Sequence, residues 1–334
     1  MSNSLTDEEF HTLISLAKKV IWSDTATRRK IQQQRINIIP ANFYSNIPLV
    51  DDVITSFEYR SEGSEIYNSN IFNRQKIKDF MDIIMHYAHE FSQPENGCIE
   101  DPETFFWKNP AFSYSDAMSY YCILRHFKPA HVLEIGSGFS TLVAQEALKK
   151  NGSGKLTLIE PYPKEFLKKL DVVETIIESF VQDIPQLKLI ELVESADVWF
   201  IDSTHTVKVG SDCLYIYLKI MPEISRDIIV HSHDIFLPYG LPQKNVLEKH
   251  IYWTEQYLLY AYMLDNPKIE VLFGSAYAIR VIPDVLKKFM AGKYPGGGGS
   301  IWYKLNGDSA NQKKMPPKLA SRCLEWAKLV FKKT

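Results

Sequence analysis

The sequence has few cysteines and no long apolar run. Its four cysteines, among 334 residues, lie far apart and form no C-x-x-C pair. A disulfide framework or a structural zinc site is therefore not expected, and the reducing cytoplasm is the simplest location. The sequence contains no stretch of about 18 apolar residues that could span a membrane. Its polar, acidic beginning does not resemble a signal peptide.

The chain also lacks an excess of charge of either sign. It has 38 Lys and Arg against 40 Asp and Glu, which gives a net charge of −2. This balance supplies no field to hold nucleic acid or anionic lipid, so neither partner is expected. Hydrophobic residues make up 45% of the chain and charged residues 23%, which is typical of a globular protein. The sequence leaves open whether copies of the chain form a homo-oligomer.

The N-terminal third of the sequence predicts helices and loops without a strong strand. A capping-box pattern followed by apolar residues at helical spacing predicts a helix over residues 7–22. The same spacing predicts a second helix over residues 75–92, and the proline-bearing text at 93–113 predicts a linker. We therefore expect a helical N-terminal region, residues 1–111, that serves as a lid, a substrate-binding region or a dimer contact.

From residue 114 onward, short β-branched runs alternate with helical stretches. Near-continuous apolar strands separated by helices predict a parallel sheet that is buried on both faces. The predicted strands are residues 131–135, 155–159, 175–177, 197–201, 228–231, 269–278 and 300–305. The sequence between these strands predicts a long aromatic helix over 246–264 and a mobile glycine loop at 296–299. The fold class is thus α/β, a Rossmann-like doubly wound sheet over residues 112–306, with a C-terminal helix within 307–334.

A glycine loop, Gly136-Ser137-Gly138, follows the first predicted strand, and a helix begins directly after it at Ser140 or Thr141. Glycines let a ligand approach the backbone closely, and the free N–H groups of a helix N-terminus favour an anionic group. The third position of a dinucleotide fingerprint would be glycine or alanine, but here it is Thr141. The loop therefore predicts a nucleotide-type ligand without specifying a dinucleotide.

Two acids accompany the glycine loop. Glu134 stands two residues before the first glycine, where a carboxylate would repel a pyrophosphate but could pair with an ammonium or sulfonium group. Glu160 ends the next predicted strand, about twenty residues further along. In dinucleotide folds an acid at that position accepts hydrogen bonds from a ribose diol. Together these acids favour a cationic ligand that carries a ribose.

Further polar side chains stand at the ends of the later strands. They are Gln182 and Asp183 after the third strand, Asp202 and His205 after the fourth, and His233 and Asp234 after the fifth. These side chains should converge, because ligands in open α/β sheets bind outside the carboxyl ends of the strands. Asp202 and Asp234 could share a divalent cation such as Mg²⁺ or Mn²⁺. Alternatively, His205 or His233 acts as a general base.

As an ordered set, these segments resemble a class I S-adenosylmethionine-dependent methyltransferase, most of all the bacterial branch known as methyltransferase domain family 24. The similar segments are the glycine loop, Ile-Glu-Pro-Tyr-Pro at 159–163, Val-Gln-Asp at 181–183, Phe-Ile-Asp-Ser-Thr-His at 200–205 and His-Asp-Ile-Phe-Leu-Pro at 233–238. The resemblance spans roughly residues 114–305 and departs from the branch at Thr204, where a serine is usual.

The resemblance implies S-adenosylmethionine as the cofactor and a last strand that runs antiparallel. It implies that the glycine loop and Glu134 hold the methionine part, that Glu160 holds the ribose, and that Gln182 or Asp183 lies near the adenine. The cofactor-binding set would be Glu134, Gly136, Ser137, Gly138, Ser140, Thr141, Glu160, Gln182, Asp183 and Asp202. The catalytic set would be Asp202, His205, His233 and Asp234.

The resulting hypothesis is methyl transfer to a small-molecule or peptide acceptor, at oxygen, with or without a metal. Two other functions stay open at this point. One is a catalytically silent methyltransferase fold that serves as a scaffold, against which the complete set of acids argues. The other is an NAD-dependent dehydrogenase, which Glu134 and Thr141 disfavour.

Overall fold

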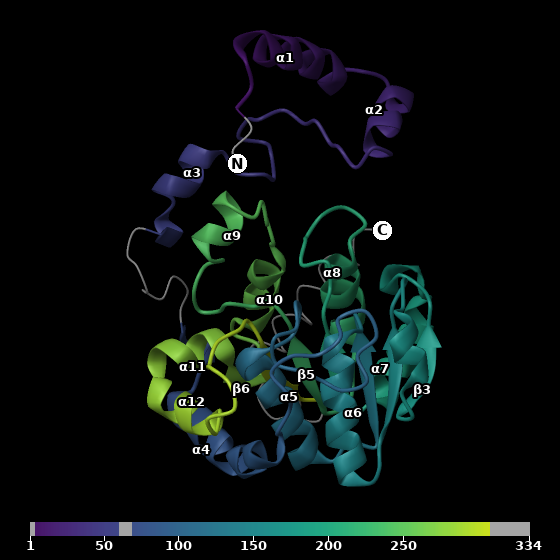
Figure 1. Ribbon diagram of the computed structural model, residues 1–334, viewed down its shortest axis with the longest axis vertical. Coiled ribbons are helices and arrows are strands. Elements are labelled where there is room, and N and C mark those ends of the chain that lie inside the picture. The colour runs from purple at the N-terminus through teal and green to yellow at the C-terminus, as the bar shows by residue number, and fades with distance from the viewer. Residues whose placement is uncertain (1–3, 60–68, 308–334) are drawn as a thin grey trace, which may run out of the picture.

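The centre of the molecule is a seven-stranded sheet with the strand order β3-β2-β1-β4-β5-β7-β6 (Figure 1). The computed structural model describes residues 4–59 and 69–307. The strands are β1 (His131–Ile135), β2 (Lys155–Ile159), β3 (Val173–Ile177), β4 (Val198–Ile201), β5 (Ile228–Ser232), β6 (Ile269–Gly274) and β7 (Ile301–Leu305). The first five pair in parallel, whereas β7 is antiparallel to both of its neighbours. The predicted Rossmann-like sheet with a final antiparallel strand is confirmed.

Helices cover both faces of this sheet because the chain crosses it in two directions. The connection from β1 to β2 runs toward one edge and the connection from β4 to β5 toward the other. Since such crossovers are right-handed, their helices lie on opposite faces. The first connection contains α6 (Phe139–Asn151), and the second contains α8 (Asp212–Tyr215) and the π-helical turn η6 (Ile216–Ile220). Two further helices cover the sheet, α5 (Tyr114–Phe127) before β1 and α7 (Gln186–Ser195) between β3 and β4. In agreement, α5 packs along α6, while α7 packs against η6.

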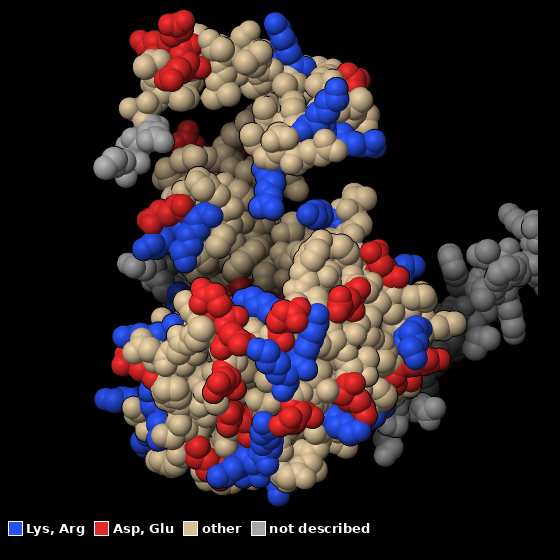
Figure 2. Space-filling view, turned by 45° about the vertical axis from the view of Figure 1, so that its right-hand side comes forward, with Lys and Arg blue, Asp and Glu red and all other residues tan. Residues whose placement is uncertain are grey.

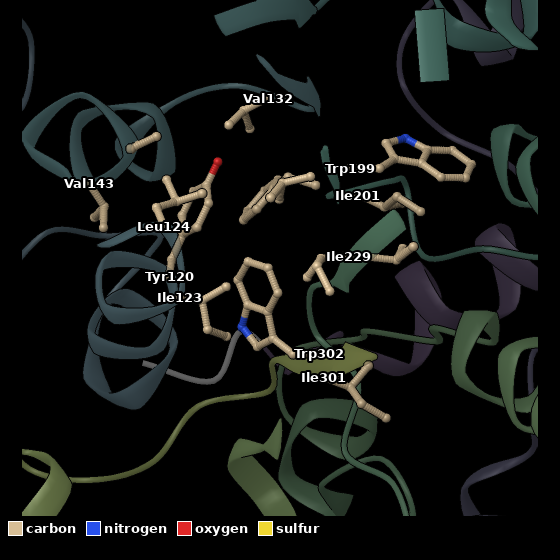
Figure 3. Packing of buried hydrophobic residues seen from close by; sticks show 14 of the residues in the cluster. Tyr120, Ile123, Leu124, Val132, Val143, Trp199, Ile201, Ile229, Ile301 and Trp302 are labelled. Carbon is tan, nitrogen blue, oxygen red and sulfur yellow. The ribbon is translucent and has the colours of Figure 1, made fainter. Parts of the chain in front are cut away.

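Large aromatic side chains fill the space between the sheet and its helices. Tyr120 from α5 and Trp302 from β7 are fully buried with their ring centroids 5.5 Å apart, and Trp199 from β4 is also fully buried but lies away from them (Figure 3). The indole N–H of Trp302 donates to the hydroxyl of Ser119 at 3.0 Å, so its polar atom is satisfied. Each such buried side chain contributes about 1.5–3 kcal/mol to folding. The strand ends that carry the functional residues therefore stand on a rigid base.

The first two helices form an arm that stands apart from this body (Figure 1). They are α1 (Asp7–Ile21), which begins with the predicted capping box of Thr6 and Glu9, and α2 (Thr25–Gln32). Neither helix has a buried residue. Acidic side chains gather at the start of α1, and basic ones lie toward its end and on α2 (Figure 2). The arm is thus helical, as predicted, but contributes nothing to the core.

Two later helices of the N-terminal third, α3 (Val50–Thr55) and α4 (Arg74–Ile84), pack onto the body. The helix α3 contacts α9 (Gln243–Leu247). The helix α4 buries an apolar face that belongs to the same hydrophobic core as the sheet. It is shorter than the predicted helix over 75–92, because the chain tightens into the 3₁₀ segment η3 (Met85–Glu90).

The predicted long helix over 246–264 is wrong. The structure has two helices there, α9 and α10 (Glu255–Met263), separated by irregular backbone. The first N–H groups of the second helix, at Thr254 and Glu255, donate to the backbone carbonyl of His205 at 2.7 and 3.0 Å. These bonds fix where α10 begins and bring Glu255 beside the candidate site.

Two other details differ from expectation. The strand predicted over 269–278 ends at Gly274, and the helix α11 (Ser275–Val281) follows it directly, with α12 (Pro283–Phe289) next. The glycine run at 296–299 is anchored rather than mobile, since the N–H groups of Gly299 and Ser300 donate to the Asp116 carboxylate at 3.0 Å. The predicted tail helix lies outside the described residues. Within the described ranges, no helix is long and apolar enough to cross a membrane.

Candidate functional site

The glycine loop, Gly136-Ser137-Gly138, connects β1 to α6 as predicted. Gly136 has a φ of +77°, and a Cβ placed on it would lie 2.1 Å from the backbone carbonyl oxygen of Asp202. By contrast, a Cβ on Gly138 would meet nothing within 4 Å. Position 136 therefore requires glycine, because its backbone is left-handed and the carbonyl of Asp202 leaves no room for a side chain. Gly138 instead leaves open space in which a ligand could approach the chain.

Glu160 lies directly against this loop. Its carboxylate accepts the N–H of Ser137 at 3.2 Å and the N–H of Tyr162 at 2.9 Å. The hydroxyl oxygen of Ser137 is buried and has no partner among the described residues. The structure thus brings together the loop and the acid that the sequence associated with a ribose, and it leaves a polar atom beside them for a ligand.

Glu134 lies beneath the loop rather than facing it. Its side chain is fully buried, and its two oxygens accept the hydroxyl of Tyr120 at 2.7 Å and that of Thr141 at 2.6 Å. Burial raises the pKa of Glu134 to about 7, although the two hydroxyl donors oppose that shift. The hydroxyl of Thr141 also accepts the N–H of Gly138 at 3.2 Å. Glu134 therefore holds the loop from below, through Thr141.

The remaining predicted cofactor residues follow the same edge of the sheet. Ser140 is buried in the first turn of α6, while Gln182 and Asp183 lie in the turn η5 (Val181–Asp183) after β3. Sequence reasoning missed a pair of exposed aromatic rings at this edge, Tyr162 and Phe180, whose centroids are 5.8 Å apart. Their only signal was an aromatic residue shortly after each of two neighbouring strands.

The four predicted catalytic residues converge at the ends of β4 and β5. We call Asp202, His205, His233 and Asp234 the charge cluster. Nε2 of His205 lies 3.1 Å from Asp202 Oδ1 and 3.6 Å from Asp234 Oδ2. Nδ1 of His233 lies 3.5 Å and 3.8 Å from the same two oxygens. The convergence that the strand order predicted is therefore present in the structure.

Two buried carboxylates that the sequence did not reveal stand behind the histidines. Glu255 accepts Nδ1–H of His205 at 2.8 Å, and Asp116 lies 3.4 Å from Nε2 of His233. Each imidazole ring thus has a carboxylate at both of its nitrogens. No local pattern pointed to either acid, because each lies far along the chain from its histidine.

This arrangement determines which members of the cluster carry charge. Burial works against charge on His205, but the neighbouring carboxylates Asp202 and Glu255 raise its pKa to about 10. The pKa of His233 is likewise raised well above its usual value, by carboxylates that outweigh burial. Both histidines are therefore imidazolium cations at neutral pH, with no lone pair free to accept a proton.

The two aspartates of the cluster differ from each other. Burial disfavours charge on Asp202, but the adjacent histidines hold its pKa well below the usual range. At Asp234 burial prevails, and the pKa is raised despite the same histidines. Since a proton acceptor works best when its pKa approaches the ambient pH, Asp234 is the better acceptor of the two.

The expected divalent cation finds no support in this geometry. Within residues 4–59 and 69–307, no group of three or more His, Cys, Asp or Glu side chains is arranged to hold a metal ion. The oxygens of Asp202 and Asp234 that a cation would use face the protonated ring of His205 instead. An imidazolium at that place repels a cation, so these residues do not fit Mg²⁺ or Mn²⁺ in this arrangement.

A cavity of about 340 Å³ opens beside the charge cluster. His233 and Asp234 form one side of it, and Tyr114, Phe236 and Lys249 contribute to its other walls. The size is at the lower end of what small-molecule sites occupy, about 300–1,000 Å³. A small molecule in this cavity would lie against His233 and Asp234.

Comparisons with known proteins identify the family of this chain. A family model described as a methyltransferase domain, family 24, matches residues 133–235. An uncharacterised protein from Archaeoglobus fulgidus is 30% identical over 168 residues, which cover 48% of this chain and 73% of that protein. The family match and the seven-stranded sheet together identify a class I S-adenosylmethionine-dependent methyltransferase. Within that class, the chain belongs to methyltransferase domain family 24.

Solved structures overlay only loosely on the whole chain. A methyltransferase from Podospora anserina with bound S-adenosylhomocysteine is 18% identical, covers 68% of this chain and 88% of its own, and gives a TM-score of 0.37. An O-methyltransferase from Bacillus cereus with the same ligand is 12% identical, covers 71% and 93%, and gives 0.35. The assignment to the family therefore rests on the family model and on the strand order. The assignment excludes the NAD-dependent dehydrogenase that the sequence had left open as an alternative function.

Proposed function

We propose that this methyltransferase transfers the methyl group of S-adenosylmethionine to an oxygen atom of a small molecule. The observation that carries the proposal is the junction of the two halves of the site at Asp202. The backbone of Asp202 packs against Gly136 of the glycine loop, while its side chain belongs to the charge cluster. A ligand held by the loop would thus lie beside the groups that handle a proton.

Residues of the cofactor half have roles that follow from their contacts. Glu160, which the loop already holds through Ser137, accepts the ribose hydroxyls. The open space at Gly138 admits the methionine part, and the adenine lies toward Gln182 and Asp183, where the rings of Tyr162 and Phe180 can stack on it. Glu134 supports the loop from beneath and attracts the cationic cofactor without touching it.

In the acceptor half, Asp202 and Asp234 take different tasks. When bound, S-adenosylmethionine supplies a methyl group on a positively charged sulfur. Asp202, with its lowered pKa, keeps a negative charge at the loop and attracts that cation. Asp234, with its raised pKa and its place on the cavity wall, accepts the proton of the acceptor hydroxyl.

The histidines act as cations rather than as the general base that the sequence suggested. His205 and His233 offset the charges of the acids around them, so that two carboxylates can stand side by side. Their positive charge also stabilises the oxygen that becomes negative as Asp234 takes its proton, which is the usual effect of fixed charges in a site. Alignment of the reacting atoms supplies much of the remaining rate.

The cavity indicates the kind of acceptor. Its aromatic side chains, Tyr114 and Phe236, suit a flat ring, and the ammonium of Lys249 suits an acidic substituent on that ring. A hydroxylated aromatic acid has both features and fits a cavity of about 340 Å³. A peptide side chain that enters from outside is the other acceptor the sequence left open.

A labelled-methyl experiment tests the proposal. The purified chain is titrated with S-adenosylmethionine and, separately, with NAD, and we expect binding of the first alone. The chain is then incubated with ¹³C-methyl-labelled cofactor, a panel of hydroxylated aromatic acids and matched methoxy analogues. We expect an O-methyl carbon signal only with free hydroxyls. Transfer to nitrogen or sulfur would contradict the oxygen assignment, and binding without any transfer would support the silent scaffold.

A further inference from the structure

Glu255 is the most deeply buried carboxylate beside the charge cluster. Its side chain is 1% exposed and accepts three hydrogen bonds, all from side chains. The donors are Nδ1–H of His205 at 2.8 Å, the hydroxyl of Ser203 at 2.7 Å and the hydroxyl of Tyr217 at 2.6 Å. A buried charge is stable only when it is paired and hydrogen-bonded in this way, so the site is built around Glu255.

The backbone holds the same pair together. The carbonyl of His205 accepts the first two N–H groups of α10, those of Thr254 and Glu255. His205 and Glu255 are thus joined by both main chain and side chain, although 50 residues separate them in the sequence. Neither the angle of the ring nor its distance from the carboxylate can change without moving α10.

This contact decides the state of the other ring nitrogen. Because Nδ1 of His205 donates to Glu255, Nε2 is the atom that faces Asp202 and Asp234. A neutral ring would present a lone pair to two carboxylates there, whereas a protonated ring donates to them. The ring must therefore carry a proton on each nitrogen.

We propose that Glu255 is a positioning residue that keeps His205 protonated and aimed at Asp202 and Asp234. The role deepens the proposed function, in which Asp234 accepts the proton of the acceptor. Without the imidazolium, the charges of Asp202 and Asp234 would repel each other, and the oxygen formed on the acceptor would lose a cation nearby.

Asp116 stands in the same relation to His233, but it also has a structural task. Its carboxylate accepts the hydroxyl of Ser275 at 2.6 Å and the N–H groups of Gly299 and Ser300, at the end of the glycine run. Removing Asp116 would release that loop, whereas removing the charge of Glu255 leaves every backbone bond in place. Glu255 is therefore the acid whose substitution isolates the effect on a histidine.

Several other titratable groups surround the His205–Glu255 pair and contribute to its titration. They are Asp202 and Asp234 at the far side of the ring, His233 with its ring centroid 6.5 Å away, and Tyr217 and Cys213 near Glu255. Burial raises the pKa of Tyr217 and of Cys213 far above their usual values, so both stay neutral near pH 7. The charged neighbours of His205 are thus the three carboxylates and His233.

The test is an NMR titration of the full chain with isotopically labelled histidine, which needs no acceptor. The signal of His205, one of nine histidines, is assigned by its loss in His205→Gln. In Glu255→Gln we expect its midpoint to fall by about 1–3 pH units, the usual effect of removing an opposite charge at hydrogen-bond distance. The control Glu248→Gln, at an exposed glutamate between α9 and α10, should leave the midpoint unchanged.

A second variant covers the case in which Glu255→Gln does not fold. Glu255→Asp keeps the charge but draws it back from the ring, and the midpoint should fall by a smaller amount. A midpoint that moves in neither variant would overturn the role of Glu255. If the midpoint falls as expected but no variant or wild-type chain transfers a methyl group, the positioning role stands and the proposed function fails.

Discussion

The glycine loop and the charge cluster meet at Asp202, yet they are made from different parts of the chain. The loop depends on backbone conformation, on the left-handed Gly136 and on N–H groups that Glu160 accepts. The charge cluster depends on ionised side chains at the ends of β4 and β5 and on the carboxylates behind them, from α5 and α10. Damage to the loop should therefore remove the cofactor, whereas damage to His205, His233 or Asp234 should spare cofactor binding and stop the chemistry.

The largest effect is expected from Gly136→Ala. Alanine at this position would have to adopt the left-handed backbone of Gly136, which costs about 1–2 kcal/mol. Its Cβ would also lie 2.1 Å from the backbone carbonyl oxygen of Asp202. We expect cofactor binding to become undetectable by calorimetry and the melting temperature to fall. Gly152→Ala is the matched control, because Gly152 is also left-handed but has open space around it. Equal losses in both variants would show that strain alone, and not the contact with β4, is responsible.

Asp234→Asn is expected to have the next largest effect. The amide cannot accept the proton, and loss of a positioned general base typically lowers turnover by about 100- to 10,000-fold. Cofactor affinity should stay within about threefold of the wild type, since Asp234 lines the acceptor cavity and is not part of the glycine loop; a threefold change is about 0.7 kcal/mol. Single-turnover kinetics with labelled cofactor measure the first quantity and calorimetry the second. Asp284→Asn, at the start of α12, serves as the surface control.

A smaller change is expected from Glu160→Ala, on the cofactor side. Loss of the acceptor for the ribose hydroxyls should weaken binding of S-adenosylmethionine by about 10- to 100-fold, or about 1.4–2.8 kcal/mol. Glu165→Ala, whose side chain forms only an exposed ion pair with Lys168, should bind like the wild type. An unchanged affinity in a folded Glu160→Ala protein would remove Glu160 from the cofactor site.

Last, we expect that removal of divalent cations does not change the rate of methyl transfer. Because His205 and His233 already neutralise the aspartates, the rate in excess EDTA should equal the rate without it. Adding Mg²⁺ or Mn²⁺ should not raise the rate either. Activity that disappears in EDTA and returns with one of these ions would restore the shared cation and displace Asp234 as the unaided acceptor.

The cofactor half was largely predictable because its signals are local. Glycines at a strand end, followed by a helix and then by an acid at the next strand end, specify a loop and its partner within one βαβ unit. The structure places Ser137 and Glu160 in contact accordingly. The aromatic pair Tyr162 and Phe180 was missed. So was the direction of Glu134, since a strand residue next to the loop can point toward the ligand or into the core.

The charge cluster was predictable only in part. Strand order brought Asp202, His205, His233 and Asp234 to one edge, but it could not assign their protonation. Their protonation depends on Glu255 and Asp116, which the structure places in the first turns of α10 and α5. The predicted single helix over 246–264 placed Glu255 in its interior. The sequence therefore did not predict the irregular backbone between α9 and α10 that brings Glu255 to His205.

The glycine run before β7 limits where the chain can be lengthened. Low-complexity glycine stretches are the usual choice for inserting a tag or a fluorescent domain, since exposed loop tips tolerate extra residues. Here a Cβ on Gly298 would lie 2.3 Å from the carboxylate of Asp116, and a Cβ on Gly299 would lie 3.1 Å from the Cα of Asp234. An insertion would therefore shift the loop relative to Asp116, the carboxylate that lies beside His233. For this protein, the described segment that most resembles a spacer is one of the least suitable places for a fusion.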